Sequence, residues 1–233
     1  MFRILPLTLF FLLLQAPITH AHDQWIQQNG NELTVVTGHW GGGATPCNPY
    51  KIKEFKAFDA SGIINNADAR FKGKATIFLH QQGAIAATAY QEEGFHSTTP
   101  EGDKPVSKRM AGDSIETMYY QHYIKTLLGW DKSLAEPLGS KFEIVPLQNP
   151  LAMKTGNHLP ILVYYDGKPS PDTAVDDGAT AGALNRTDNR GRTSITVSTS
   201  GRQVITAFRK EPYHDPADAD HLIITANLSY IIP

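Results

Sequence analysis

The chain has 233 residues, of which 41% are hydrophobic, 19% charged and 9% aromatic. This composition excludes a disordered chain, a collagen-like repeat and a long coiled coil, because each of these needs a far more biased mixture. The formal net charge of -2 gives no global field that attracts polyanions, so no nucleic-acid partner is expected. With one cysteine, Cys47, the chain cannot form an intramolecular disulfide.

Residues 1–21 are typical of a secretory signal peptide. Arg3 precedes a nearly unbroken apolar run over residues 4–14, and small side chains at Thr19 and Ala21 suit cleavage after Ala21. The run is too short to span a bilayer, and no later stretch reaches the length of a transmembrane helix. We therefore expect a periplasmic protein whose mature chain starts at His22 and has no transmembrane segment.

The first half of the mature chain is expected to form an N-terminal β-sandwich module over residues 22–112. Short apolar runs alternate with turn residues, which is typical of an antiparallel sandwich. The predicted strands cover residues 33–37, 55–58, 75–79 and 84–90.

One segment has helical periodicity. Asp113 and Glu116 form a plausible capping box, Gly129 is a good stop signal, and apolar residues recur between them at helical spacing. This pattern predicts a helix at about residues 114–128, within a connecting segment of residues 113–130.

A second β-sandwich module is expected over residues 138–233. Its predicted strands cover residues 141–146, 159–165, 194–197, 202–208 and 221–232, with strong turn signals at residues 166–169 and 188–192. The size fits an immunoglobulin-like sandwich. The predicted fold is thus all-β, with two β-sandwich modules joined by one helix.

A free N-terminal histidine would be a chelating ligand for a metal ion. Its α-amine and imidazole can bind one divalent ion together, and one or two further imidazoles would complete a site for Cu, Ni, Co or Zn. His22 is that residue if cleavage follows Ala21, and Asp23 beside it is a candidate ligand or supporting carboxylate.

The other candidate ligands are histidines near the ends of predicted elements. His39 follows a strand and precedes three glycines, and His96 ends the strand region of the first module. His80 and His122 are further candidates. An isolated histidine is more often a hydrogen-bonded or solvated residue than a ligand, and we assign His158, His214 and His221 to that role.

Cys47 could serve as a soft ligand near His39, but its surroundings favour a buried thiol. The sequence lacks a nucleophile elbow, a His-Glu-x-x-His zinc motif and a phosphate-binding loop. We accordingly predict a protein that is not an enzyme.

Several segments together resemble the DUF4198 family, exported proteins grouped with periplasmic components of nickel and cobalt uptake systems. They begin with residues 21–26, which start Ala-His-Asp-Gln-Trp, and continue through residues 37–39, 49–62, 123–128, 138–150, 165–169 and 187–192. The resemblance implies two sandwich-like parts, the second similar to transthyretin-like modules, and its pattern places His22 and His39 among the functional residues.

These observations lead to a metal-binding hypothesis with two alternatives. The first is a periplasmic protein that captures Ni(II) or Co(II) for a membrane permease, using His22, His39 and a further histidine. The second is a copper protein with an N-terminal histidine brace, acting as a chaperone or an oxidative enzyme. The third is a metal-free adhesion or carbohydrate-binding module that stacks sugars on Trp25, Trp40 and Trp130.

Overall fold

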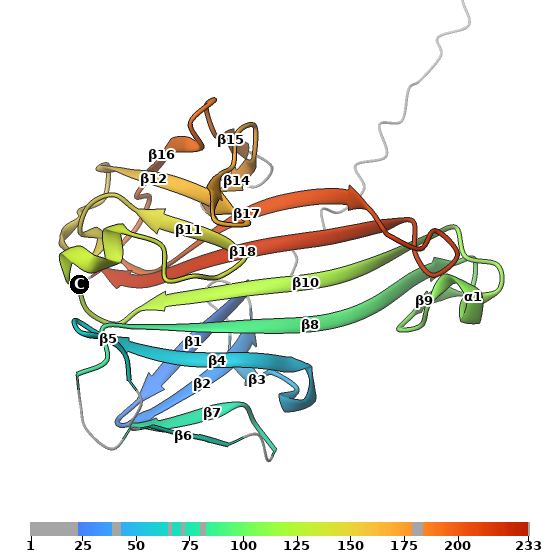
Figure 1. Cartoon of the computed structure of the whole chain (residues 1–233), viewed down its shortest axis with the longest axis horizontal. Helices are drawn as coiled ribbons and strands as arrows, with labels where there is room; N and C mark the ends of the chain where they lie inside the picture. The colour runs from blue at the N-terminus through green and yellow to red at the C-terminus, as the bar shows by residue number, and fades with distance from the viewer. Residues whose placement is uncertain are drawn as a thin grey trace, which may run out of the picture.

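The computed structural model describes residues 23–38, 43–64, 67–70, 73–79, 83–178 and 184–232. These residues form three sheets, and the largest is the central layer of the molecule (Figure 1). The fold is all-β, as the sequence predicts. No helix among the described residues is long and apolar enough to cross a membrane.

The central sheet takes strands from both halves of the chain. Its order is β15-β14-β17-β18-β10-β8-β4-β5, and β9 pairs with β8. The strands are β4 (Ile52–Asp59), β5 (Gly62–Ile63), β8 (Ala86–Thr99), β9 (Gly102–Lys104), β10 (Glu116–Leu127), β14 (Ala174–Asp176), β15 (Leu184–Arg186), β17 (Gly201–Pro212) and β18 (His221–Ile232). The parallel β10–β18 pair joins the two halves at the middle of this sheet.

Two smaller sheets cover the central sheet. The first contains β1 (Asp23–Asn29), β2 (Glu32–Gly38), β3 (Ala44–Pro46), β6 (Ala67–Arg70) and β7 (Thr76–Leu79). The second contains β11 (Phe142–Pro146), β12 (His158–Tyr165), β13 (Lys168–Pro169) and β16 (Arg192–Thr196). One short α-helix, α1 (Lys108–Ala111), and 3-10 turns at Pro49–Lys51, Lys132–Ala135 and Pro150–Ala152 complete the described elements.

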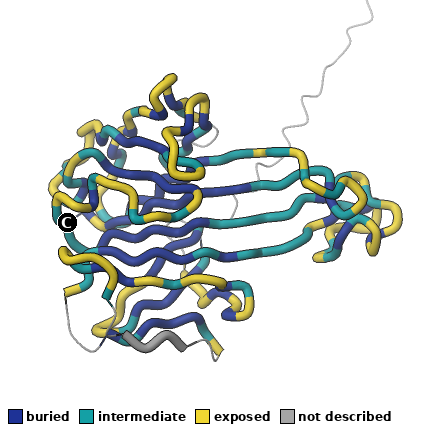
Figure 2. The backbone as a smooth tube through the Cα atoms, viewed as in Figure 1, coloured by how far each residue is buried: buried dark blue, intermediate teal, exposed yellow. Residues whose placement is uncertain are grey.

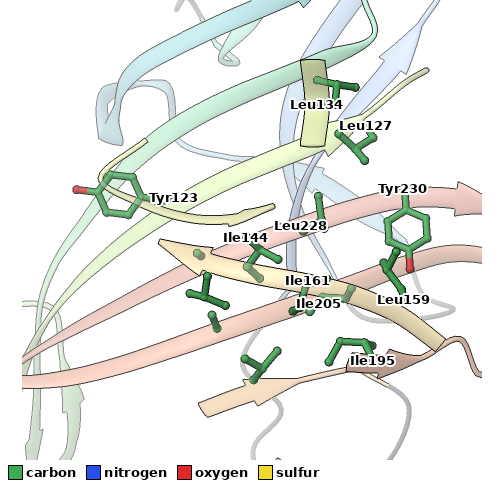
Figure 3. Packing of buried hydrophobic residues seen from close by; sticks show 14 of the residues in the cluster. Tyr123, Leu127, Leu134, Ile144, Leu159, Ile161, Ile195, Ile205, Leu228 and Tyr230 are labelled. Carbon is green, nitrogen blue, oxygen red and sulfur yellow. The ribbon is translucent and has the colours of Figure 1, made fainter. Parts of the chain in front are cut away.

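Each covering sheet buries its own apolar cluster against one face of the central sheet. Strand β10 contributes to both, because successive side chains of a strand point to opposite faces. Tyr123 and Leu127 pack in the cluster under β11, β12 and β16, where Figure 3 shows them with Ile144 and Leu228. Ile124 packs in the cluster under β1, β2 and β7.

The helix predicted over residues 114–128 is wrong, because this segment is strand β10. Its apolar residues match a helical period by coincidence, because Tyr123, Ile124 and Leu127 lie at the end of the strand that is covered on both faces and are not confined to alternate positions. Threonine, isoleucine and three tyrosines in the segment favour an extended backbone. No connecting helix therefore separates the two predicted modules.

Most other strand and turn predictions are confirmed. The Asp166-Gly167 turn closes the β12–β13 hairpin, with φ of 48° and 71° at its two residues, the left-handed backbone that Asp and Gly tolerate best. At the 188–192 turn, the Asp188 carboxylate accepts hydrogen bonds from the amides of Arg190 and Arg192 at 2.8 Å each.

Four strands of the central sheet continue past both covering sheets. The far ends of β8, β10, β17 and β18 form an extension that carries β9 and α1 at its tip (Figure 1). Figure 2 shows that the burial of these strands changes along their length: they are buried between the layers and only half-buried in the extension. We call this part the arm, defined as residues 91–122 and 208–225.

Candidate functional site

Strands β1 and β2 place the chain neighbours of the two main candidate ligands, His22 and His39, opposite each other. Asp23 is the register partner of Gly38 in this antiparallel pair. Directly paired residues have Cα atoms about 4.5–5.5 Å apart. His22 precedes Asp23 in the chain and His39 follows Gly38, and both histidines, like His80, lie outside the described residues.

Gly38 is packed so closely that no side chain fits there. A Cβ atom at this position would lie 2.6 Å from the Gly43 carbonyl oxygen and 2.9 Å from the Trp25 ring. Gly38 also pairs with Ala44 of β3, so it is enclosed between two neighbouring strands. The glycine therefore fixes the end of β2 against both β1 and β3.

Trp25 is a core residue and is not available as a sugar-stacking platform. Its side chain is only 4% exposed, and the Arg202 guanidinium lies 4.4 Å from its ring centroid, close enough for a cation–π interaction. Trp130 packs against the larger apolar cluster as a partly buried residue, and Trp40 lies outside the described residues.

His96 and His122 lie on the same face of the arm but do not meet. The Tyr120 ring stands between them, with its centroid 6.2 Å from each imidazole centroid. His96 pairs with Met118 and His122 pairs with Gln91, so the two histidines are four residues apart along β10, or about 13 Å. They cannot bind one ion together.

His122 is held as a neutral imidazole. Its Nδ1 atom is 2.8 Å from the Thr225 hydroxyl. Burial disfavours the charged imidazolium and lowers the pKa of His122 to about 4; the nearby Glu93 opposes this effect and Lys51 adds to it. The side chain is thus uncharged at neutral pH and already engaged with a partner.

Cys47 is buried, as the sequence favours. Loss of hydration raises the pKa of its thiol to about 12, and the nearby carboxylate of Glu93 acts in the same direction. A protonated, buried thiol is a poor metal ligand. Among the described residues, no three or more histidine, cysteine, aspartate or glutamate side chains gather in a metal-binding arrangement.

The acidic turn between β17 and β18 is an ion-pair partner of α1. The Arg109 guanidinium lies 2.5 Å from Asp215 and 3.0 Å from Asp218, and Lys108 pairs with Asp220. These carboxylates therefore hold the tip of the arm together.

The prediction from sequence overlooked the partners of Met118. This residue pairs with His96 on β8 and with His221 on β18. No sequence signal points to this arrangement, because His221 is 103 positions from Met118 and the expected helix placed Met118 in a different element.

Comparison with known proteins identifies a family model that the chain matches. The model of the family described as "Domain of unknown function (DUF4198)" matches residues 19–211. Searches of curated proteins and of solved structures find no match.

Proposed function

Since the chain belongs to the DUF4198 family, we propose that it binds a transition-metal ion through its mature N-terminus. The ligands are the α-amine and imidazole of His22 together with the imidazole of His39, and Asp23 supports them. Nitrogen ligands of this kind suit Ni(II) and Co(II) as well as Cu(II).

The Asp23–Gly38 pair is the observation that supports this proposal most strongly. Each histidine is covalently bonded to one member of the pair, so the two ligands start from neighbouring points of one sheet. A site prepared in this way loses less ordering entropy on binding than one assembled from distant loops. The close packing around Gly38 keeps this end of β2 in place.

In this proposal the protein captures the metal ion in the periplasm. The signal-peptide pattern of residues 1–21 supports export, and cleavage after Ala21 would create the chelating amine. The captured ion, nickel or cobalt, is passed to a membrane permease. A copper site built on the same ligands is the alternative that the metal titration distinguishes.

A titration of correctly processed protein tests the proposal. Mature chain starting at His22 is titrated with Ni(II), Co(II) and Cu(II), and its affinities are compared with those of His22→Ala, His39→Ala and a control, His158→Ala. His158 is exposed on β12 and far along the chain from the proposed ligands. We expect each ligand substitution to weaken binding by more than about tenfold, and the control to leave it unchanged.

A chain with one extra residue before His22 isolates the role of the amine. This variant keeps both imidazoles but removes the chelate that the free α-amine forms with its own side chain. Its affinity should fall as far as that of His22→Ala. Equal affinity of the extended, His22→Ala and unmodified chains would exclude the proposed site, and tighter binding of copper than of nickel or cobalt would favour the copper alternative.

A further inference from the structure

Three potential soft-metal ligands lie side by side across the arm. Register pairs place His96 of β8 beside Met118 of β10, and Met118 beside His221 of β18. Adjacent strands are about 4.8 Å apart, so the three Cα atoms form a row about 10 Å long with the methionine at its centre.

The three side chains point to the same face of the arm. Register partners share a face, and contacts along β10 show which face it is. His122 contacts its partner Thr225 on this side, and Glu116 lies 3.7 Å from His221 on the same side. The Ser97–Thr117 hydrogen bond of 2.7 Å lies on the opposite face, as the alternation of a strand requires.

This row is accessible to solvent. His96 is exposed, and Met118 and His221 are half-buried, because the covering sheets end before this part of the arm (Figure 2). The three residues are therefore accessible from this face of the arm.

The donor set selects for a soft ion. A thioether is a soft ligand that favours Cu(I) over Ni(II) and Co(II), and imidazole also binds copper. The carboxylate of Glu116, 3.7 Å from His221, is already paired with Lys210 at 2.9 Å. The Tyr120 hydroxyl donates a hydrogen bond to the Met118 sulfur at 3.4 Å, which orients the thioether.

We propose that His96, Met118 and His221 form a Cu(I) site on the arm, separate from the N-terminal site. The sulfur of Met118 lies between the two imidazoles and forms the base of the site. Binding turns His96 away from the Tyr120 ring, 6.2 Å between centroids, and turns His221 away from Glu116. Both movements are side-chain rotations and leave the strands unchanged.

Anaerobic titration tests this site independently of the N-terminus. Full mature chain carrying His22→Ala and His39→Ala is titrated with Cu(I) against a chromophoric Cu(I) chelator. We expect one equivalent to bind, and Met118→Leu, His96→Gln and His221→Gln each to weaken binding by about tenfold or more. Met110→Leu and His158→Gln are matched controls, since both residues are exposed and outside the row.

X-ray absorption of the copper-loaded protein gives a second readout. We expect one sulfur and two nitrogen ligands in the parent chain, and loss of the sulfur in Met118→Leu. Far-UV circular dichroism of each variant verifies that the sheet is intact. A copper site without sulfur, or Met118→Leu binding Cu(I) as tightly as Met110→Leu, would overturn the proposal. Failure of Ni(II) binding at His22 leaves these outcomes unaffected, so the two proposals fail separately.

Discussion

Lys125 and Glu143 form an ion pair that is almost completely buried between β10 and β11. The Nζ–Oε1 distance is 2.7 Å, and the side chains are 3% and 1% exposed. Lys125 also donates to the Ile144 carbonyl at 3.1 Å, and the carboxylate accepts the backbone amides of residues 138, 139 and 140. Burial lowers the pKa of Lys125, and the carboxylate of Glu143 opposes that effect. The pair thus fixes how the loop before β11 meets the central sheet.

Removing one partner should destabilise the protein strongly. Lys125→Met leaves the Glu143 carboxylate buried without its cation, and the loss of unfolding free energy should be about 3–5 kcal/mol. Urea unfolding measures this difference. Lys56→Met is the matched control, because Lys56 pairs with Glu54 on the surface and such pairs contribute at most about 1 kcal/mol. Equal effects of the two substitutions would contradict this interpretation of the buried pair.

His122 should make stability depend on pH. Its pKa is about 4 in the folded chain and about 6.5 when exposed, so the unfolded state binds more protons between these values. Its contribution is fully present above pH 6.5 and is lost as the pH falls toward 4, by up to about 3 kcal/mol.

The pH dependence of urea unfolding for wild type and His122→Gln measures this contribution. Glutamine can keep a hydrogen bond to Thr225 but does not titrate. Wild type should therefore lose unfolding free energy relative to His122→Gln as the pH falls from 6.5 to 4. A constant difference across this range would show that His122 titrates normally. His158→Gln, at an exposed position, should show no such trend.

At the scale of elements, the arm depends on contacts between segments distant in sequence. Asp220, just before β18, accepts the Thr117 amide of β10 at 2.9 Å and pairs with Lys108 of α1. The Lys108 amide in turn donates to the Asp218 carbonyl at 2.8 Å. The Lys108 ammonium, together with the Thr117 amide, lowers the pKa of Asp220. This aspartate therefore connects β10, β18 and α1 at the tip.

Asp220→Asn should loosen the tip and leave the layered core unaffected. The neutral amide loses the ion pair with Lys108, and a charged hydrogen bond that is partly exposed to solvent is worth about 1–2 kcal/mol. Amide hydrogen exchange should accelerate by about fivefold to thirtyfold in residues 104–117, with no change in β11 and β12. Asp103→Asn, an exposed position on β9, is the control. Uniform acceleration across all three sheets would show that the tip is not a separate unit of stability.

At the scale of the whole molecule, the central sheet connects the two halves of the chain. Strands β4, β8 and β10 come from before residue 130, and β14, β17 and β18 come from after it. Both apolar clusters include side chains of β10. The two covering layers therefore share one supporting sheet.

Unfolding should accordingly be a single cooperative transition. Near-ultraviolet circular dichroism, which follows the tyrosines and tryptophans, and far-ultraviolet circular dichroism, which follows the strands, should give coincident urea curves. Two resolved transitions would mean that the halves fold as separate domains despite the shared sheet.

The sequence predicts the individual strands well and their pairing poorly. The β12–β13 hairpin is local, so its Asp-Gly turn and alternating residues are sufficient to identify it. The end of strand β10 at Tyr123–Leu127 is covered on both faces, which removes there the alternation that distinguishes a strand from a helix. The Met118–His221 pairing depends on which strands are neighbours in the central sheet, and the Lys125–Glu143 contact depends on how two sheets pack; no local pattern encodes either. Burial of Cys47 follows from residue type alone.

Strand β18, the last in sequence among the described strands, lies in the interior of the central sheet between β10 and β17. Its parallel partner β10 begins about a hundred residues earlier, so this pairing closes a long loop and forms slowly. During synthesis the central sheet stays divided until β18 has left the ribosome. A truncation just before His221 would therefore delete a central strand, and the shortened chain would present unpaired edges on β10 and β17 to protein quality control.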